Sequence, residues 1–228
     1  MANDLNIKQC WFHKDHYDIP KSRIKEITDK CTLVTTREIV NIKNNNMELR
    51  MYFFVPYNLS PIQQGIQAGH AAQQYDLNFR DNFQTIDFIS NHKTWIILNG
   101  GTTNESEESP GTMQMIMDEI LVFNEHHGRD INLAWFHEPD LNDAMTAFCF
   151  VCEEPVFNYE DYPDLADYIK GTQFPGKTLN DVKHINNLWS YDELREAFPT
   201  VYPIWEKELM GGPKNVFLRQ LLKGKKLA

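Results

Sequence analysis

A row of amide and imidazole side chains is the feature of this sequence best suited to chemistry. Four such residues recur at helical spacing within Leu59–Tyr75, so a helix there places them on one face: Gln63, Gln67, His70 and Gln74. A solvated helix face usually carries charged residues instead. The row predicts a site that recognises a polar group through hydrogen bonds.

The start of this predicted helix is a second feature. Ser60 suits the capping position, Pro61 suits the first helical position, and Gln63 completes a capping box with Ser60. The free N–H groups of a helix start also attract a phosphate or a carboxylate. Gln63 therefore has two alternative roles, closing the capping box or facing a ligand.

Further candidates lie between two predicted strands later in the chain. Glu138 and Asp140 supply carboxylates that can act as a general base, and Thr146 supplies a hydroxyl. Each has a plainer alternative. The two carboxylates belong to a strongly acidic stretch and would form a solvated rim, Thr146 would be an ordinary strand residue, and His70 would pack between helix and sheet.

These residues resemble the signature of the type 2 peptidyl-tRNA hydrolase family. In that family a helix after the first strand carries a lysine, then A-A-Q, two small residues and H-A, which is similar to Gln63-x-x-x-Gln67-x-x-His70-Ala71-Ala72. The order of elements is similar too: strand, helix pair, strand with a tryptophan (Trp95), helix, strand, acidic turn and final strand. The resemblance covers about residues 47–152, under half of the chain.

The resemblance implies cleavage of the ester between a peptide and its tRNA. Gln67 and His70 match family positions, Thr146 matches a later threonine, and Glu138 or Asp140 would stand for an aspartate. Gln63 replaces the lysine, whose charge can hold a phosphate or stabilise a developing oxyanion. Loss of that charge would cost about 3 kcal/mol, roughly a hundredfold in rate.

Two functions follow from this pattern. The first is a binding or regulatory protein that uses the hydrolase-like fold with a degraded catalytic site, and its partner is a small polar ligand, a tRNA or another protein. The alternative is an active esterase on peptidyl-tRNA or a related aminoacyl ester. In it, His70 or an acidic residue of 138–140 is the base, and Gln67 and Gln63 position the substrate. The segments outside 47–152 favour binding, because the family enzymes are compact and lack them.

The charge distribution opposes a nucleic acid along part of the chain. Residues 101–167 contain sixteen acidic residues against the single Arg129, a net charge of −15 within a total of −10. A polyphosphate backbone would be repelled there. Basic residues concentrate in the closing segment, from Lys214 to Lys226, where they also suit a helix C-terminus.

The cysteines predict neither a disulfide scaffold nor a cofactor site. Cys149 and Cys152 lie in a predicted strand, where an i, i+3 pair points to opposite faces. Another group has residue types that suit zinc: Cys10, His13, His16 and Cys31. Its first three members fall within seven residues, so solvated histidines beside buried thiols are expected instead. We expect no metal and no cofactor.

Membrane insertion and secretion are not expected. No apolar run approaches the roughly 18 to 20 residues that cross a bilayer. The first residues lack a basic segment followed by an apolar one, so the cytosol is the expected compartment. An apolar stripe on the predicted helix 213–223 would dock on the chain's own core or on a second copy, which leaves a homo-oligomer open.

Hydrophobic periodicity predicts the elements that position these residues. Strands are expected over 33–43 and 47–56, joined as a hairpin at Asn44–Asn46, and then over 94–98, 131–136 and 144–152. Helices are expected over 59–75, 79–91 and 113–126, with a glycine-rich loop over 99–112. The fold class is α/β: a small mixed, partly parallel sheet of four to five strands with helices on both faces.

Three regions are expected. Residues 1–46 form an N-terminal extension with one strand of the hairpin, residues 47–152 form the α/β domain, and residues 153–228 form a helical annex. The annex begins with turns rich in Pro, Tyr and Asp, and its helices are expected over 179–188, 190–198 and 213–223.

Overall fold

The computed structural model describes residues 47–103, 110–171 and 191–228. By their contacts, residues 47–228 form one unit, separate from residues 1–46. Several sequence expectations fall outside the described residues: the strand 33–43, the cysteine and histidine group of Cys10–Cys31, the helix 179–188 and residues 104–109 of the loop 99–112.

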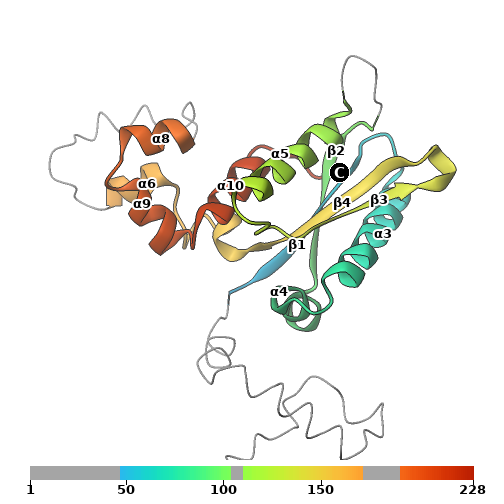
Figure 1. Ribbon diagram of the computed structural model, residues 1–228, viewed down its shortest axis with the longest axis horizontal. Helices are drawn as coiled ribbons and strands as arrows, with labels where there is room; N and C mark the ends of the chain where they lie inside the picture. Colours follow the sequence, from blue (N-terminus) through green and yellow to red (C-terminus); the bar gives the residue numbers. More distant parts are fainter. Residues whose placement is uncertain (1–46, 104–109, 172–190) are drawn as a thin grey trace, which may run out of the picture. The chain divides into compact units, whose positions relative to one another are not determined.

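Four strands form one mixed sheet in the order β2-β1-β4-β3 (Figure 1). Strand β1 pairs in parallel with β2, and β4 pairs antiparallel with both β1 and β3. Strands β1, β2 and β3 therefore run in one direction and β4 in the other, so the sheet is partly parallel as predicted. The bounds are β1 Leu49–Pro56, β2 Thr94–Gly101, β3 Leu133–Glu138 and β4 Ala144–Glu153.

Strand β1 is central and buried on both faces, which its almost wholly apolar sequence predicts. Phe53 and Val55 face one side of the sheet, and Tyr52 and Phe54 face the other. From residue 50 to residue 54, one edge of β1 pairs with β2 and the other with β4. Over these residues both edges of β1 are therefore occupied by neighbouring strands.

Helix α3, Pro61–Phe79, covers one face of the sheet. Its inner surface is built from small residues, Ala68, Ala71 and Ala72, with Tyr75 at the end of the row, and all four are buried. Small side chains let the helix approach the sheet closely. Gly65 of α3 does not take part in this packing, because no atom lies within 4 Å of where its Cβ would lie.

The helix boundaries differ from the predicted ones because of a cap. Helix α3 continues to Phe79, since nothing in its last turn ends it at Tyr75. The next helix, α4, begins at Phe83 because the Asn82 side chain accepts hydrogen bonds from the N–H groups of Gln84 and Thr85. A π-helical turn, Phe88–His92, follows α4 and leads into β2.

Strand β2 runs past its predicted end into the segment expected to be a loop. Gly101 pairs with Pro56, and the Asn99 N–H donates to the carbonyl of Lys226 at 2.9 Å. Backbone partners on both sides therefore extend the strand through Asn99, Gly100 and Gly101, although asparagine and glycine usually favour a turn.

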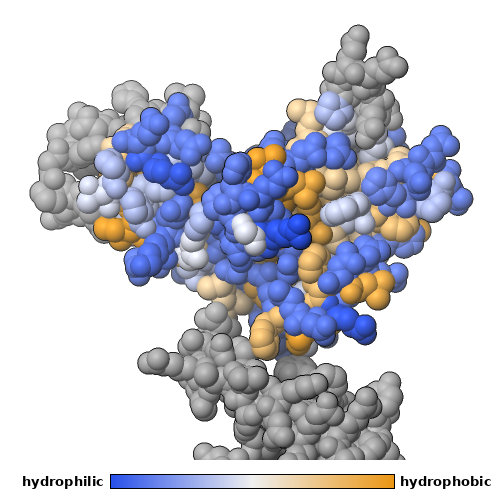
Figure 2. Space-filling view, viewed as in Figure 1, coloured by the Kyte–Doolittle hydropathy of each residue, from blue (hydrophilic) through white to orange (hydrophobic). Residues whose placement is uncertain are grey.

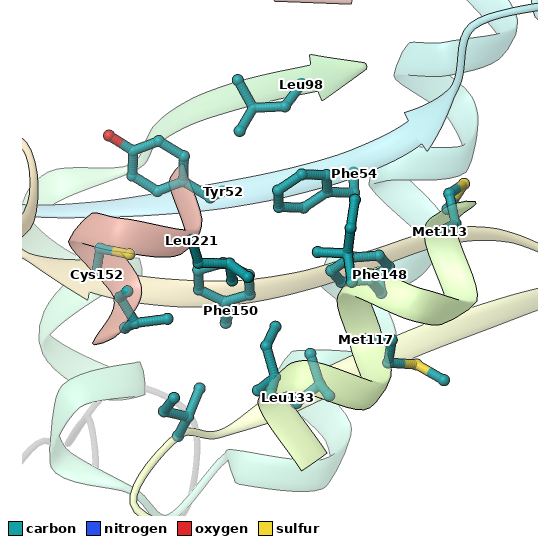
Figure 3. Packing of buried hydrophobic residues seen from close by; sticks show 14 of the residues in the cluster. Tyr52, Phe54, Leu98, Met113, Met117, Leu133, Phe148, Phe150, Cys152 and Leu221 are labelled. Atoms are coloured by element: carbon teal, nitrogen blue, oxygen red, sulfur yellow. The ribbon is translucent and has the colours of Figure 1, made fainter. Parts of the chain in front are cut away.

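The other face of the sheet is covered by α5, Thr112–His126, and α10, Pro213–Leu222. Figure 3 shows the core they enclose: aromatic rings of β1 and β4 meet methionines of α5 and Leu221 of α10. Phe54 stacks on Phe148 with 4.8 Å between ring centroids. Helices thus lie on both faces, which confirms the predicted architecture.

The rest of the annex has its own small core. Helices α6, Leu165–Gly171, α8, Tyr191–Ala197, and α9, Tyr202–Ile204, pack around the buried Trp205, which belongs to the π-helical turn Trp205–Leu209. The predicted helices 190–198 and 213–223 correspond to α8 and α10. Helices α6 and α9 were not predicted, because α6 is short and follows a turn-rich segment while Pro203 sits inside α9.

Polar contacts of α10 join the annex to the sheet. Arg219, buried to 1 % exposure, donates to the carbonyls of Pro155 and Tyr162 at 2.9 and 2.6 Å. The Lys214 ammonium lies 2.7 Å from the carboxylate of Glu153 at the end of β4. These contacts fix α10 against the segment that follows β4.

Cys149 and Cys152 lie on opposite faces of the sheet, as strand alternation predicts. Burial raises the pKa of both thiols, so both are protonated and inert. Within 47–103, 110–171 and 191–228, no three His, Cys, Asp or Glu side chains gather as metal ligands. In those same ranges no helix is long and apolar enough to cross a bilayer.

The Glu153–Lys214 pair predicts a pH-dependent stability. Burial raises the pKa of Glu153, but Lys214 and the Asn215 amide outweigh that effect and hold the pKa below its ordinary value. Such a carboxylate stabilises the fold above its unfolded pKa, and the contribution is lost as the pH falls through the folded value. In urea unfolding at pH 7, Glu153→Gln should lower stability by about 1–2 kcal/mol. The difference should shrink below about pH 4.

The matched control is Glu160→Gln, which removes an exposed carboxylate. It should leave stability at pH 7 nearly unchanged. An equal loss for both variants would show that the Lys214 pair contributes nothing specific.

Candidate functional site

The carboxyl ends of three strands meet along one side of the sheet, which we call the carboxyl edge to distinguish it from the outer edges formed by β2 and β3. Because β1, β2 and β3 run in the same direction, their carboxyl ends lie together, and β4 begins there. Helix α3 follows β1 from this edge, and the Gln64 amide donates to the carbonyl of Pro56 at 3.1 Å. Ligands of open α/β sheets commonly bind beyond the carboxyl ends of parallel strands. Glu138 closes β3 and Thr146 lies near the start of β4, so both belong to this edge.

Gln67 joins the candidate residues into one hydrogen-bonded chain. The Thr146 hydroxyl donates to Gln67 Oε1 at 2.6 Å, and Gln67 Nε2 donates to Glu138 Oε2 at 2.7 Å. Gln67 and Thr146 are 8 % and 1 % exposed. A donor at one end and a carboxylate at the other hold the amide in a single orientation.

An irregularity of β4 turns Thr146 toward α3. Phe136 of β3 pairs with Ala147, but the next residue, His137, pairs with Met145, so Thr146 is an extra residue in β4. Met145 packs on the α5 side and Ala147 on the α3 side. A bulge of this kind re-aims one side chain, which is how Thr146 reaches Gln67 despite strand alternation.

His70 lies one helical turn after Gln67 and contacts the same strand. Its ring is tilted against the ring of Phe136 with 4.5 Å between centroids, and its Nδ1 is buried without a hydrogen-bond partner. Phe136 precedes Glu138 by two residues, so both face α3. Phe136 is a site residue that the sequence did not reveal, because an aromatic residue in a strand is usually part of the core.

Gln63 does not join this group. Its Oε1 accepts hydrogen bonds from the backbone N–H and the hydroxyl of Ser60, at 3.1 and 2.9 Å, and the Ser60 hydroxyl accepts from the Gln63 N–H. Of its two alternative roles, the structure shows the capping box. Gln74 donates instead to Asn78, so the predicted row reduces to Gln67 and His70.

Asp140 lies in the turn between β3 and β4, with its side chain exposed. Asn142 and Asp143 adopt positive φ of 54° and 58° to close that turn, a conformation that Asn and Asp tolerate better than most residues. Of the two carboxylates, Glu138 therefore is the one that contacts Gln67.

The charge of this group is negative. Glu138 forms no ion pair within the described residues, and the sequence from Ile131 to Glu153 contains neither lysine nor arginine. The site offers one carboxylate, one imidazole nitrogen and one fixed amide. Such a set accepts hydrogen bonds from a ligand and lacks a cation that would hold an anion.

No family model matches this sequence, and no curated protein matches it. The resemblance to type 2 peptidyl-tRNA hydrolases therefore stays a prediction, and it rests on the motif around Gln67 and on the order of elements.

The Thr146–Gln67 hydrogen bond predicts a stability effect that is specific for the hydroxyl. Thr146→Val keeps the shape of the side chain but leaves Gln67 Oε1 buried without its donor, so unfolding free energy should fall by about 1–2 kcal/mol. Thr146→Ser retains the donor and should recover part of this loss. Equal losses for Val and Ser, measured by urea unfolding, would assign the effect to packing instead.

Proposed function

We propose that this chain is a binding protein on a fold that resembles the type 2 peptidyl-tRNA hydrolases, with a site that holds a small polar ligand and does not turn it over. The site consists of Gln67, His70, Glu138, Thr146 and Phe136 at the carboxyl ends of the strands.

The observation that carries this proposal is the position of Gln63. Ester cleavage needs a group that stabilises the developing oxyanion, and a positive charge in the family lysine's place would supply it. Gln63 is neutral, exposed and bonded to Ser60. No other lysine or arginine lies on α3 before Arg80 or on the β3–β4 hairpin, so nothing in these elements replaces the charge.

The hydrogen bonds of Gln67 support the same conclusion. Its carbonyl accepts from Thr146 and its amide nitrogen donates to Glu138. A side chain committed at both ends to the protein is a rigid part of the site wall. One N–H of the amide remains for a ligand, which suits recognition better than movement of a proton.

The chemistry of the groups indicates the kind of ligand. The Glu138 carboxylate accepts hydrogen bonds from N–H donors, and the His70 Nδ1 beside Phe136 is without a partner. A protonated amine would supply such donors and would compensate the charge of Glu138. The net charge of −15 over residues 101–167 disfavours a tRNA backbone at this edge.

An esterase on peptidyl-tRNA or a related aminoacyl ester is the second candidate function. The observation in its favour is His70, whose Nδ1 has no partner and whose ring lies against Phe136 of β3. An unpartnered imidazole nitrogen can serve as a general base toward water. The missing cation weighs against it.

Turnover of purified peptidyl-tRNA separates these two functions. We expect the wild-type protein to release no peptide above the uncatalysed rate, because no charge stabilises the oxyanion. Gln63→Lys restores a lysine at the family position and should raise the rate if the site is a decayed hydrolase site, by up to about a hundredfold. Hydrolysis by the wild type that Gln67→Leu and His70→Ala both abolish would replace the binding proposal with the esterase.

Ligand binding tests the role of Glu138. Glycinamide, which carries a protonated amine, should shift the side-chain NMR signals of Gln67 and His70 in a saturable manner, and N-acetylglycinamide should not. Glu138→Gln should weaken this binding about tenfold or more, because it removes the charge that the amine compensates. The control Asp140→Asn removes an exposed carboxylate two residues away and should leave binding unchanged. Equal effects of both substitutions would contradict a specific site.

A further inference from the structure

The two outer edges of the sheet differ. The β2 edge is covered by residues 226–228: Leu227 forms a bridge with Leu98, and the Ala228 N–H donates to the carbonyl of Ile97 at 3.0 Å. No residue of the described part pairs with the outer edge of β3. As far as residues 47–103, 110–171 and 191–228 are concerned, the backbone N–H and C=O groups at that edge are open to a further strand.

Strand β3 lacks the features that usually protect such an edge. Its sequence, LAWFHE, contains no lysine and no proline, and Trp135 is 42 % exposed. Natural proteins blunt free edges with charge, proline or a covering segment, because an apolar edge pairs with other chains. The only charged group of β3 other than a histidine is Glu138, at its end.

Helix α3 exposes apolar side chains among its glutamines on the side next to this edge. Figure 2 shows hydrophobic surface over α3 and α4. On α3 three large apolar side chains are exposed by 50 to 77 %: Ile62, Ile66 and Leu77. Helical spacing places Ile66 and Leu77 beside His70, which contacts β3 through Phe136. The β3 edge and this side of α3 therefore adjoin, while Trp135 lies on the other face of the sheet, opposite Phe148 of β4; we call the edge with its flanking side chains the β3–α3 surface.

We propose that two copies of this chain associate through their β3–α3 surfaces as a symmetric dimer. The two β3 strands pair antiparallel and join the sheets into one of eight strands. In a two-fold pairing, the register must keep each side chain on its own face of the sheet. A register centred on the strand that does so sets Trp135 of one copy opposite Trp135 of the other. Cross-strand pairs of aromatic residues stabilise a sheet.

The position of α3 fits this arrangement. Helix α3 packs over both β3 and β4, and strands lie about 4.8 Å apart, so the α3 helices of two copies would run roughly 10 Å apart. This spacing is close to the 8–10 Å of packed helices.

The register also pairs the exposed side chains of α3. Gln67 lies by Glu138 and His70 by Phe136, so α3 runs antiparallel to β3 and passes Trp135 near Ala72. At a rise of 1.5 Å per residue, Ile66 lies about 9 Å before that point and Leu77 about 8 Å after it. Two antiparallel α3 helices therefore place Ile66 of one copy against Leu77 of the other.

Charge has opposing effects on the same pairing. Arg129, the only lysine or arginine between residues 101 and 167, lies in the turn just before β3. Glu138 and Asp140 end β3 and begin the next turn. Antiparallel pairing brings Arg129 of one copy to the acidic end of the other, but the same register sets Asp130 opposite Asp140. The apolar contact is therefore the main source of stability.

Sedimentation equilibrium of the full chain tests the dimer. We expect a species of twice the 26.7 kDa chain mass. Ile66→Lys and Trp135→Lys should each raise the dissociation constant by about tenfold or more, because each buries a charge in the contact. The matched controls are Met115→Lys, 50 % exposed on α5, and Trp95→Lys, 43 % exposed on β2. Both should leave the dissociation constant unchanged in protein that circular dichroism shows to be folded.

A cysteine placed on β3 tests the register. Under oxidation Trp135→Cys should form a disulfide between two copies, since opposed Cβ atoms lie about 5 Å apart. Trp95→Cys and the wild type should not. The proposal would be overturned by a protein that is monomeric at every concentration. It would also be overturned by a dimer that tolerates both lysine substitutions and crosslinks only through Trp95→Cys. In a monomer, slow hydrogen exchange of the β3 amides would show that another segment of the same chain covers the edge.

Discussion

The burial of β1 on every side is the constraint on which the rest of the fold depends. Both of its faces and both of its edges are occupied, so its backbone groups are satisfied by β2 and β4 and its side chains by two layers of helix. The parallel neighbour forces a crossover through α3, and the antiparallel neighbour brings β4 back with β3 beyond it. As a result, the carboxyl ends of β1, β2 and β3 and the start of β4 lie together at the carboxyl edge of the sheet.

The site depends on that edge and on one amide. Gln67 connects the helix layer to both β3 and β4, so it couples the position of α3 to the orientation of Glu138 and Thr146. Because each end of the amide is bonded to the protein, the site is already ordered without a ligand. Under the proposed binding function, a ligand would meet a site that needs little rearrangement, which is an advantage for recognition. The same rigidity leaves His70 as the one member with an unused buried nitrogen.

The two outer edges of the sheet differ in what covers them and in the charge nearby. The β2 edge is covered by the chain itself, while the β3 edge carries Trp135 and adjoins the exposed side of α3. The β3–β4 hairpin is acidic, and the apolar side chains exposed on β3 and α3 are of the kind found at protein contacts. A symmetric contact there would place each site beside the partner helix, close to His70, and so would join assembly and recognition in the same structural element.

The sequence by itself determined the parts of this fold that rest on local patterns. Periodicity and caps predicted the four strands, α3, α5 and α10, and the alternation in β4 predicted that Cys149 and Cys152 face opposite sides. Only the tertiary structure decided which side chains meet. Gln63 closes its local capping box, which the S-x-x-Q pattern favoured, but whether it also reached the site depended on where β3 lies. Glu138 was separated from Asp140, Thr146 was turned by a bulge, and Phe136 joined the site, because register and packing between distant segments leave no local signal.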